Sequence, residues 1–187
     1  MGADGLAPTL LLAMPQLVDS NFARSVVLLC KHNEEGALGF VVNRPVNTTA
    51  SELLSLDPPP APGCALTVWE GGPVSPERGW LLCRNAPQDG DGFEVCDGIY
   101  MSSSQALLKR ILAGDPRECE ADRSRLILGY AGWGPGQLDA ELTASSWLNI
   151  PVDVDLVFET PATDLWKSAF RILGVDPVSL TPAPGIH

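Results

Sequence analysis

Hydrophobic residues occur in short blocks separated by glycine, proline and charged residues, and these blocks predict mainly strands. An apolar run covers residues 10–14, and two β-rich runs, SVVLLCKH (25–32) and ALGFVVNRP (37–45), follow it. The NEEG segment at 33–36 between the last two runs has turn chemistry, so the pattern predicts a β-hairpin. Pro45 cannot donate to a strand ladder and is predicted to end the second strand.

The remaining pattern mixes strands with helices. We predict further strands at residues 66–72, 79–85, 93–102, 125–133 and 153–160, and helices at 49–56, 105–114, after Pro135 and at 163–173. PVSPER (73–78) reads as a turn, and DPPPAPG (57–63) and APQDGDG (86–92) read as loops. Strands outnumber helices and cluster early, which favours an α+β fold over a doubly wound parallel sheet.

A glycine-rich segment, GYAGWGPGQLDAEL (129–142), begins within the apolar strand predicted at 125–133 and leads into a helix. Its spacing matches neither a Walker loop nor a dinucleotide fingerprint, because Pro135 follows Gly134 and Gln137 stands where a third glycine is needed. One interpretation is a tight bend that starts a helix. The other is an anion site at Gly132, Gly134 and Gln137, since helix N-termini beside glycines bind anions.

Length and composition predict one globular domain over residues 1–187, with irregular tails at 1–7 and 178–187. No apolar run approaches the ~18 residues that cross a membrane, and the first residues lack the basic start of a signal peptide. We therefore expect a cytoplasmic protein. Its five cysteines form no C-x-x-C pair and are expected to be free thiols.

Charge argues against a nucleic-acid binder. The chain has 12 basic and 23 acidic residues, so its net charge is −11. Proteins that bind nucleic acids present a basic face to the phosphates, and no basic run longer than Lys109-Arg110 occurs.

Three blocks together carry a family resemblance: residues 14–45, EGGPVSPERGWLLC (70–83) and LGYAGWGPGQLDAELTASSWL (128–148). In order and spacing they resemble the YqgE/AlgH family. The resemblance implies a bacterial cytoplasmic α+β domain whose bifurcated, mostly antiparallel β-sheet curls into a pseudo-barrel flanked by helices. It implies no settled activity, and the family's label of transcriptional regulator rests on a regulatory association.

Polar residues within these blocks are the candidate functional groups. Asp19 and Asn21 precede the first hairpin strand, where either an Asx turn or an ion pair of Asp19 with Arg24 accounts for them. His32 is the only internal histidine, and a catalytic triad would have to use it.

Asn43 and Arg44 stand at the end of the hairpin. The planar guanidinium of Arg44 suits either a carboxylate or phosphate ligand or a structural ion pair. If this end of the hairpin met the bend at residues 132–137, the two would form a ligand site.

The sequence favours a non-enzymatic protein, because it lacks a nucleophile elbow and clusters of metal ligands. We assign no catalytic residue, metal or cofactor. Asp153 and Asp155 share one face of a predicted strand and could hold a hard cation, but two carboxylates alone do not establish a metal site. The leading hypothesis is a binding or regulatory protein that acts through a protein partner or a small anionic ligand. The alternatives are a transcriptional regulator, and an enzyme or nucleotide-binding protein using the site between Asn43-Arg44 and the bend.

Overall fold

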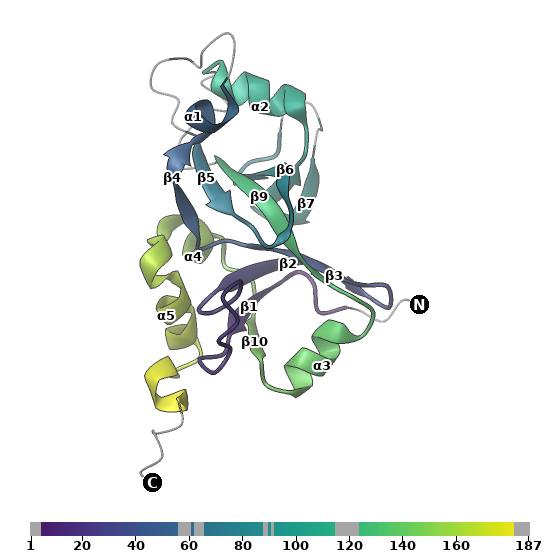
Figure 1. The fold of residues 1–187 in the computed structure, drawn as a ribbon, viewed down its shortest axis with the longest axis vertical. Coiled ribbons are helices and arrows are strands. Elements are labelled where there is room, and N and C mark those ends of the chain that lie inside the picture. Colours follow the sequence, from purple (N-terminus) through teal and green to yellow (C-terminus); the bar gives the residue numbers. More distant parts are fainter. Residues whose placement is uncertain are drawn as a thin grey trace. The chain divides into compact units, whose positions relative to one another are not determined.

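A computed structural model describes residues 5–55, 61, 66–87, 90, 92–114 and 124–181 (Figure 1). The chain divides into two compact units. The terminal unit contains residues 1–43 and 131–187, and the central unit contains residues 44–130. The single-domain organisation stays a prediction. Outside the described residues lie the chain ends at 1–4 and 182–187, Cys64, Cys119 and most of the predicted loop at 57–63.

The terminal unit is built on an antiparallel sheet. Its strand order is β10 (Trp147–Ile150), β1 (Thr9–Ala13), β2 (Val26–Asn33), β3 (Gly36–Val41) and the last three residues of β9 (Ser124–Trp133). Every residue of β1 is buried, because the strand is central and helices cover both faces of this sheet.

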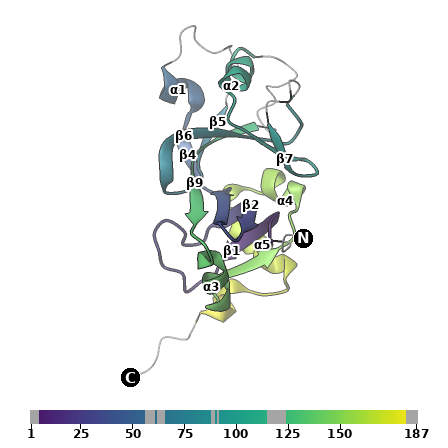
Figure 2. The same cartoon turned by 90° about the vertical axis from the view of Figure 1, so that its right-hand side faces the viewer.

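The terminal unit contains three helices: α3 (Gln137–Thr143), α4 (Val154–Glu159) and α5 (Ala162–Ile172). Figures 1 and 2 show α3 on one face and α5 on the other. Leu138 of α3 packs with Leu11 and Val27 in one core cluster. The Trp166 indole of α5 donates to the Ala13 carbonyl oxygen at 2.8 Å, which ties α5 to β1.

The central unit has a second sheet, covered on one face by α1 (Ala50–Leu54) and α2 (Gln105–Leu112). Its strand order is β4 (Pro45–Thr49), β5 (Thr67–Glu70), β9, β6 (Val74–Cys83), β8 (Ile99–Ser102) and β7 (Phe93–Cys96). Only the β5–β9 pair is parallel among the described strands. Figure 2 shows β6 curving in this sheet, where its pairing is irregular between Val74 and Gly79.

β9 is the strand at which the sheet branches. Its residues up to Tyr130 pair with β5 and β6, and Ala131 to Trp133 pair with β3. The predicted α+β class with a curled, bifurcated and mostly antiparallel sheet is therefore confirmed. Within the described part of the chain, no helix is long and apolar enough to cross a membrane.

Local predictions with strong turn or cap signals are confirmed. The hairpin forms as β2 and β3, and α2 begins after Ser104, whose hydroxyl accepts from the Leu107 amide. The bend leads into α3 as predicted, and Leu138 of this helix is buried.

The largest error concerns residues 153–160, which form helix α4 and not a strand. Asp153 is the N-cap of α4, and its carboxylate accepts from the Leu156 amide at 3.0 Å. The Asp-Val-Asp alternation that predicted a strand is thus a capped first turn. Asp153 and Asp155 consequently do not share a strand face. The strand β10 just before this helix was not predicted.

Other boundaries also differ. β3 ends at Val41, and Pro45 begins edge strand β4, where a missing amide is tolerated. The predicted turn at 73–78 belongs to β6, and the predicted strand at 93–102 is the β7–β8 hairpin around Asp97-Gly98.

Two chain-end predictions also need correction. The helix predicted at 163–173 begins one residue earlier, at Ala162, and Pro161, not Thr163, stands at the cap position of α5. The supposed tail after Pro177 begins with a 3-10 helix, Pro177–Leu180, because the Asp176 carboxylate accepts from the Val178 amide.

Candidate functional site

The glycine bend is held by side chains of its own helix. The Gly134 amide donates to Gln137 Oε1 at 3.0 Å, and Gln137 Nε2 donates to Glu141 Oε1 at 2.9 Å. The Gln137 amide is bonded to the Gly134 carbonyl oxygen, and Pro135 has no amide. The bend thus uses its own donors internally, which favours the structural interpretation. Ligand contact at Gly132, Gly134 and Gln137 stays a prediction.

Glu141 also joins two buried tryptophans. The indoles of Trp133 and Trp147 both donate to Glu141 Oε2, at 3.0 and 2.8 Å. Trp133 is 6% exposed and Trp147 is 2% exposed, so few waters can replace this acceptor. The Phe22 ring lies 5.6 Å from Trp147 and 6.2 Å from Trp133. We call Gln137, Glu141, Trp133, Trp147 and Phe22 the α3 network.

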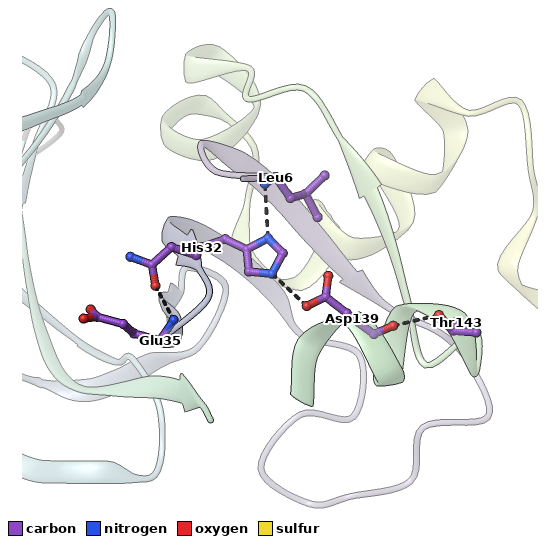
Figure 3. Close-up of polar contacts among 6 residues, drawn as sticks. Leu6, His32, Glu35, Asp139 and Thr143 are labelled. Carbon is purple, nitrogen blue, oxygen red and sulfur yellow. Dashed lines mark hydrogen bonds and ion pairs between the residues drawn. The ribbon is translucent and has the colours of Figure 1, made fainter. Parts of the chain in front are cut away.

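His32 connects the hairpin to two other segments (Figure 3). The Leu6 amide donates to His32 Nδ1 at 3.1 Å, and His32 Nε2 lies 3.3 Å from Asp139 Oδ2 of α3. Because Nδ1 accepts from the Leu6 amide, Nε2 carries the ring proton and donates to Asp139. The side chain is only 12% exposed. Both ring nitrogens therefore serve the fold.

We expect His32→Ala to lower the free energy of unfolding by about 1.5 kcal/mol, since it removes one bond to a backbone amide and one to a carboxylate. Hydrogen exchange at the Leu6 amide should accelerate, because that amide loses its acceptor. Asp139→Asn is the matched control: it keeps an oxygen acceptor and should change stability by less than about 0.5 kcal/mol. Unchanged exchange at Leu6 in His32→Ala would contradict the assigned role.

The remaining candidates of the terminal unit are also structural. Asp19 forms the Asx turn, accepting from the Asn21 amide at 2.8 Å, and makes no ion pair with Arg24. Arg24 has φ 55° and lies 5.9 Å from the Trp166 ring. Asn43 Oδ1 accepts from the Val26 amide, and Asn43 Nδ2 donates to the Arg24 carbonyl oxygen, both at 2.9 Å. Asn43 thus closes the open end of the hairpin.

The structure does not bring Asn43 to the glycine bend. Gly132 pairs with Leu38 and Trp133 pairs with Ala37, near the beginning of β3, whereas Asn43 follows the end of that strand. In the central unit, Arg44 Nη1 lies 4.0 Å from Glu70 Oε1, which matches the ion-pair interpretation. Ligand binding by Arg44 stays a prediction.

Sequence reasoning missed Glu141, Trp133, Trp147 and Arg125 as residues with defined polar roles. Glu141 stands four residues after Gln137, a spacing that places both on one helix face, and this was the available signal. The sequence contains no signal for Arg125, because this residue lies in an otherwise apolar strand. In the structure it is 8% exposed, and its guanidinium lies 4.2 Å from the Trp69 ring. Burial lowers the pKa of Arg125 to about 10, so it remains charged at neutral pH.

Comparisons with known proteins agree with this geometry. A family model described as AlgH-like matches residues 10–178. The UPF0301 protein of Stenotrophomonas maltophilia (strain K279a) is 40% identical over 183 residues, which cover 96% of this chain and 95% of that protein. The solution structure of AlgH from Pseudomonas aeruginosa superimposes with a TM-score of 0.76 at 37% identity, covering 100% of this chain and 98% of that one. A crystal structure of a Corynebacterium diphtheriae protein (TM-score 0.69, 23% identity, 92% and 90% coverage) shares the fold.

Proposed function

The chain belongs to the AlgH-like family, and from this premise we propose that it is a non-catalytic binding protein of the bacterial cytoplasm. It would act through a protein partner or a small anionic ligand. One observation carries the proposal: the polar side chains of the sequence blocks are bonded within the chain itself. Both ring nitrogens of His32, both amide atoms of Asn43 and both carboxylate oxygens of Glu141 have partners. Acid–base chemistry needs such a group to be available to a substrate.

The described cysteines give the same indication. Cys83 is buried, and Cys30 Sγ lies 3.6 Å from the Leu28 carbonyl oxygen. Burial, with Asp97 and Glu94 nearby, raises the pKa of the Cys96 thiol. A thiol with a raised pKa is mostly protonated at neutral pH and is a poor nucleophile. A transcriptional regulator that binds DNA directly receives less support, because the net charge is −11.

A thermal-shift screen of the whole protein tests the proposal. The panel contains nucleotides, phosphorylated metabolites, aliphatic carboxylates and divalent cations, and each compound is also assayed for turnover. We expect a saturable rise in melting temperature for an anionic compound without its conversion, since a ligand that binds only the folded state stabilises it by mass action. If no compound shifts the melting temperature, a protein partner becomes the expected ligand, and capture from cell extract identifies it.

The contradicting result is enzymatic. Reproducible turnover that disappears in His32→Ala or Arg44→Ala, while both variants remain folded, would overturn the non-catalytic assignment. Circular dichroism of each variant provides the folding control.

A further inference from the structure

The central unit contains a cavity of about 400 Å³ that none of the candidate residues above lines. Protein cavities of roughly 300–1,000 Å³ are the usual size for small-molecule sites. The aliphatic part of its lining comes from α1, β6, α2 and β9 and consists of five leucines: Leu54, Leu81, Leu108, Leu126 and Leu128. Such a lining favours a ligand with an aliphatic body.

Gly79 keeps the cavity open. A Cβ at this position would lie 3.2 Å from Leu126 Cδ1 and 3.8 Å from Leu128 Cδ2, so a larger side chain here would occupy space against two lining leucines. The backbone of Gly79 does not require glycine, since its φ lies outside the left-handed region. Glycine at this position therefore provides space in the cavity and is not required by the backbone conformation.

The polar part of the lining is rich in hydrogen-bond donors. Arg78, whose guanidinium lies 5.2 Å from the Trp80 ring, joins Ser103, Ser104 and Gln105 at the beginning of α2. Among the described residues that line the cavity, Glu77, which is exposed, carries the one carboxylate.

Backbone donors add to this set. The Ser104 hydroxyl and carbonyl accept from the amides of Leu107 and Leu108. The two amides that precede them, those of Gln105 and Ala106, have no acceptor within the helix. Arg78, the side-chain amide of Gln105 and these two backbone amides thus place donors on one rim of the cavity, and donors beside a leucine lining complement a carboxylate on a hydrocarbon chain.

We propose that this cavity binds a small aliphatic carboxylate, with its chain against the leucines and its head at Arg78 and the start of α2. The inference rests on the proposed function of a binding protein and specifies its ligand class.

Octanoate, octanol and butyrate separate the contributions of chain and head. Isothermal titration calorimetry should show saturable binding of octanoate to the whole protein, about tenfold weaker binding of octanol, which lacks the charge, and more than tenfold weaker binding of butyrate, which lacks half of the chain. In amide NMR spectra, octanoate should shift Gly79, Ser103 and Gln105.

Three variants locate the site. Gly79→Val should weaken octanoate at least tenfold by filling the cavity. Arg78→Gln should weaken octanoate about tenfold and leave octanol unchanged, because only the carboxylate uses the guanidinium. Arg171→Gln removes the same charge from the terminal unit and should leave octanoate binding unchanged.

The spectra of the unmodified protein keep the test decisive if Gly79→Val fails to fold. Absence of saturable octanoate binding, or shifts confined to residues outside the cavity, would overturn the inference. So would equal losses of octanoate and octanol in Arg78→Gln. If another anion binds saturably while octanoate does not, this inference fails and the proposed function stands. If His32-dependent turnover appears while octanoate binds as described, the proposed function fails and this site stands.

Discussion

Glu141→Ala is expected to lower the free energy of unfolding by about 3 kcal/mol. The substitution leaves the indole N–H groups of two nearly buried tryptophans, Trp133 and Trp147, without their common acceptor. Each hydrogen bond to a charged group contributes roughly 1.5–3 kcal/mol, and a buried donor left unpaired pays its desolvation cost. The higher helix propensity of alanine offsets only a few tenths of a kcal/mol. Urea unfolding followed by tryptophan fluorescence measures the loss.

Two controls isolate the carboxylate. Glu141→Gln keeps one oxygen acceptor and should cost about 1 kcal/mol. The Glu35 side chain at the hairpin tip is 82% exposed. Glu35→Ala removes a charge of the same sign there and should lower the free energy of unfolding by less than about 0.5 kcal/mol. Equal stability of Glu141→Ala and Glu35→Ala would show that the two indoles find other acceptors, and the α3 network would lose its assigned role.

Gly129→Ala is expected to destabilise the protein by about 3 kcal/mol, for two separable reasons. Gly129 has φ 72°, which costs an alanine about 1–2 kcal/mol. In addition, a Cβ at this position would collide with the Gly72 carbonyl oxygen and lie 3.0 Å from that of Val74. Both neighbours are backbone atoms, one in the β5–β6 connection and one in β6, and they cannot move aside cheaply, so overpacking adds about 1–3 kcal/mol.

Other glycines of the same segment serve as controls. Gly136 has nearly the same φ, 68°, with no atom within 4 Å of an added Cβ, so Gly136→Ala should show only the conformational cost of about 1 kcal/mol. Gly134 has ordinary backbone geometry and space, and Gly134→Ala should lie within about 0.5 kcal/mol of the parent. Chemical denaturation of the three variants side by side ranks their free energies of unfolding. If Gly129→Ala and Gly136→Ala were equally stable, close packing at Gly129 would not be the reason for its glycine.

The three variants also explain why the segment at 129–142 is rich in glycine. Gly129 serves close approach of strands, Gly136 serves the left-handed turn at the start of α3, and the Gly134 amide is bonded to Gln137. Sequence reasoning recognised a bend but assigned the glycines one shared purpose. Their individual purposes depend on neighbours distant in sequence, such as Gly72, which the local pattern does not contain.

The sequence by itself determined the elements whose signals are local. Alternation and the turn residues at 33–36 predict the hairpin, and the apolar periodicity after the serines at 102–104 predicts the helix at 105–114, because hydrogen bonds within a few residues decide both. The strand prediction for residues 153–160 was wrong because two local signals competed. The Asp-Val-Asp alternation resembles a strand, and the Asp153 cap, which settles α4, is equally short.

Only the tertiary structure decided which groups meet. His32 contacts Asp139 across 107 positions and Leu6 across 26, and Asn43 serves the hairpin while the glycine bend lies at the other end of β3. Contacts between residues so far apart in the sequence follow from strand order and register. A one-residue slip would move every side chain of a strand to the opposite face, and no single segment encodes its partner. The sequence therefore named the polar groups and their family, whereas the fold determined that those groups bond to one another and that the open cavity of the central unit lies among leucines.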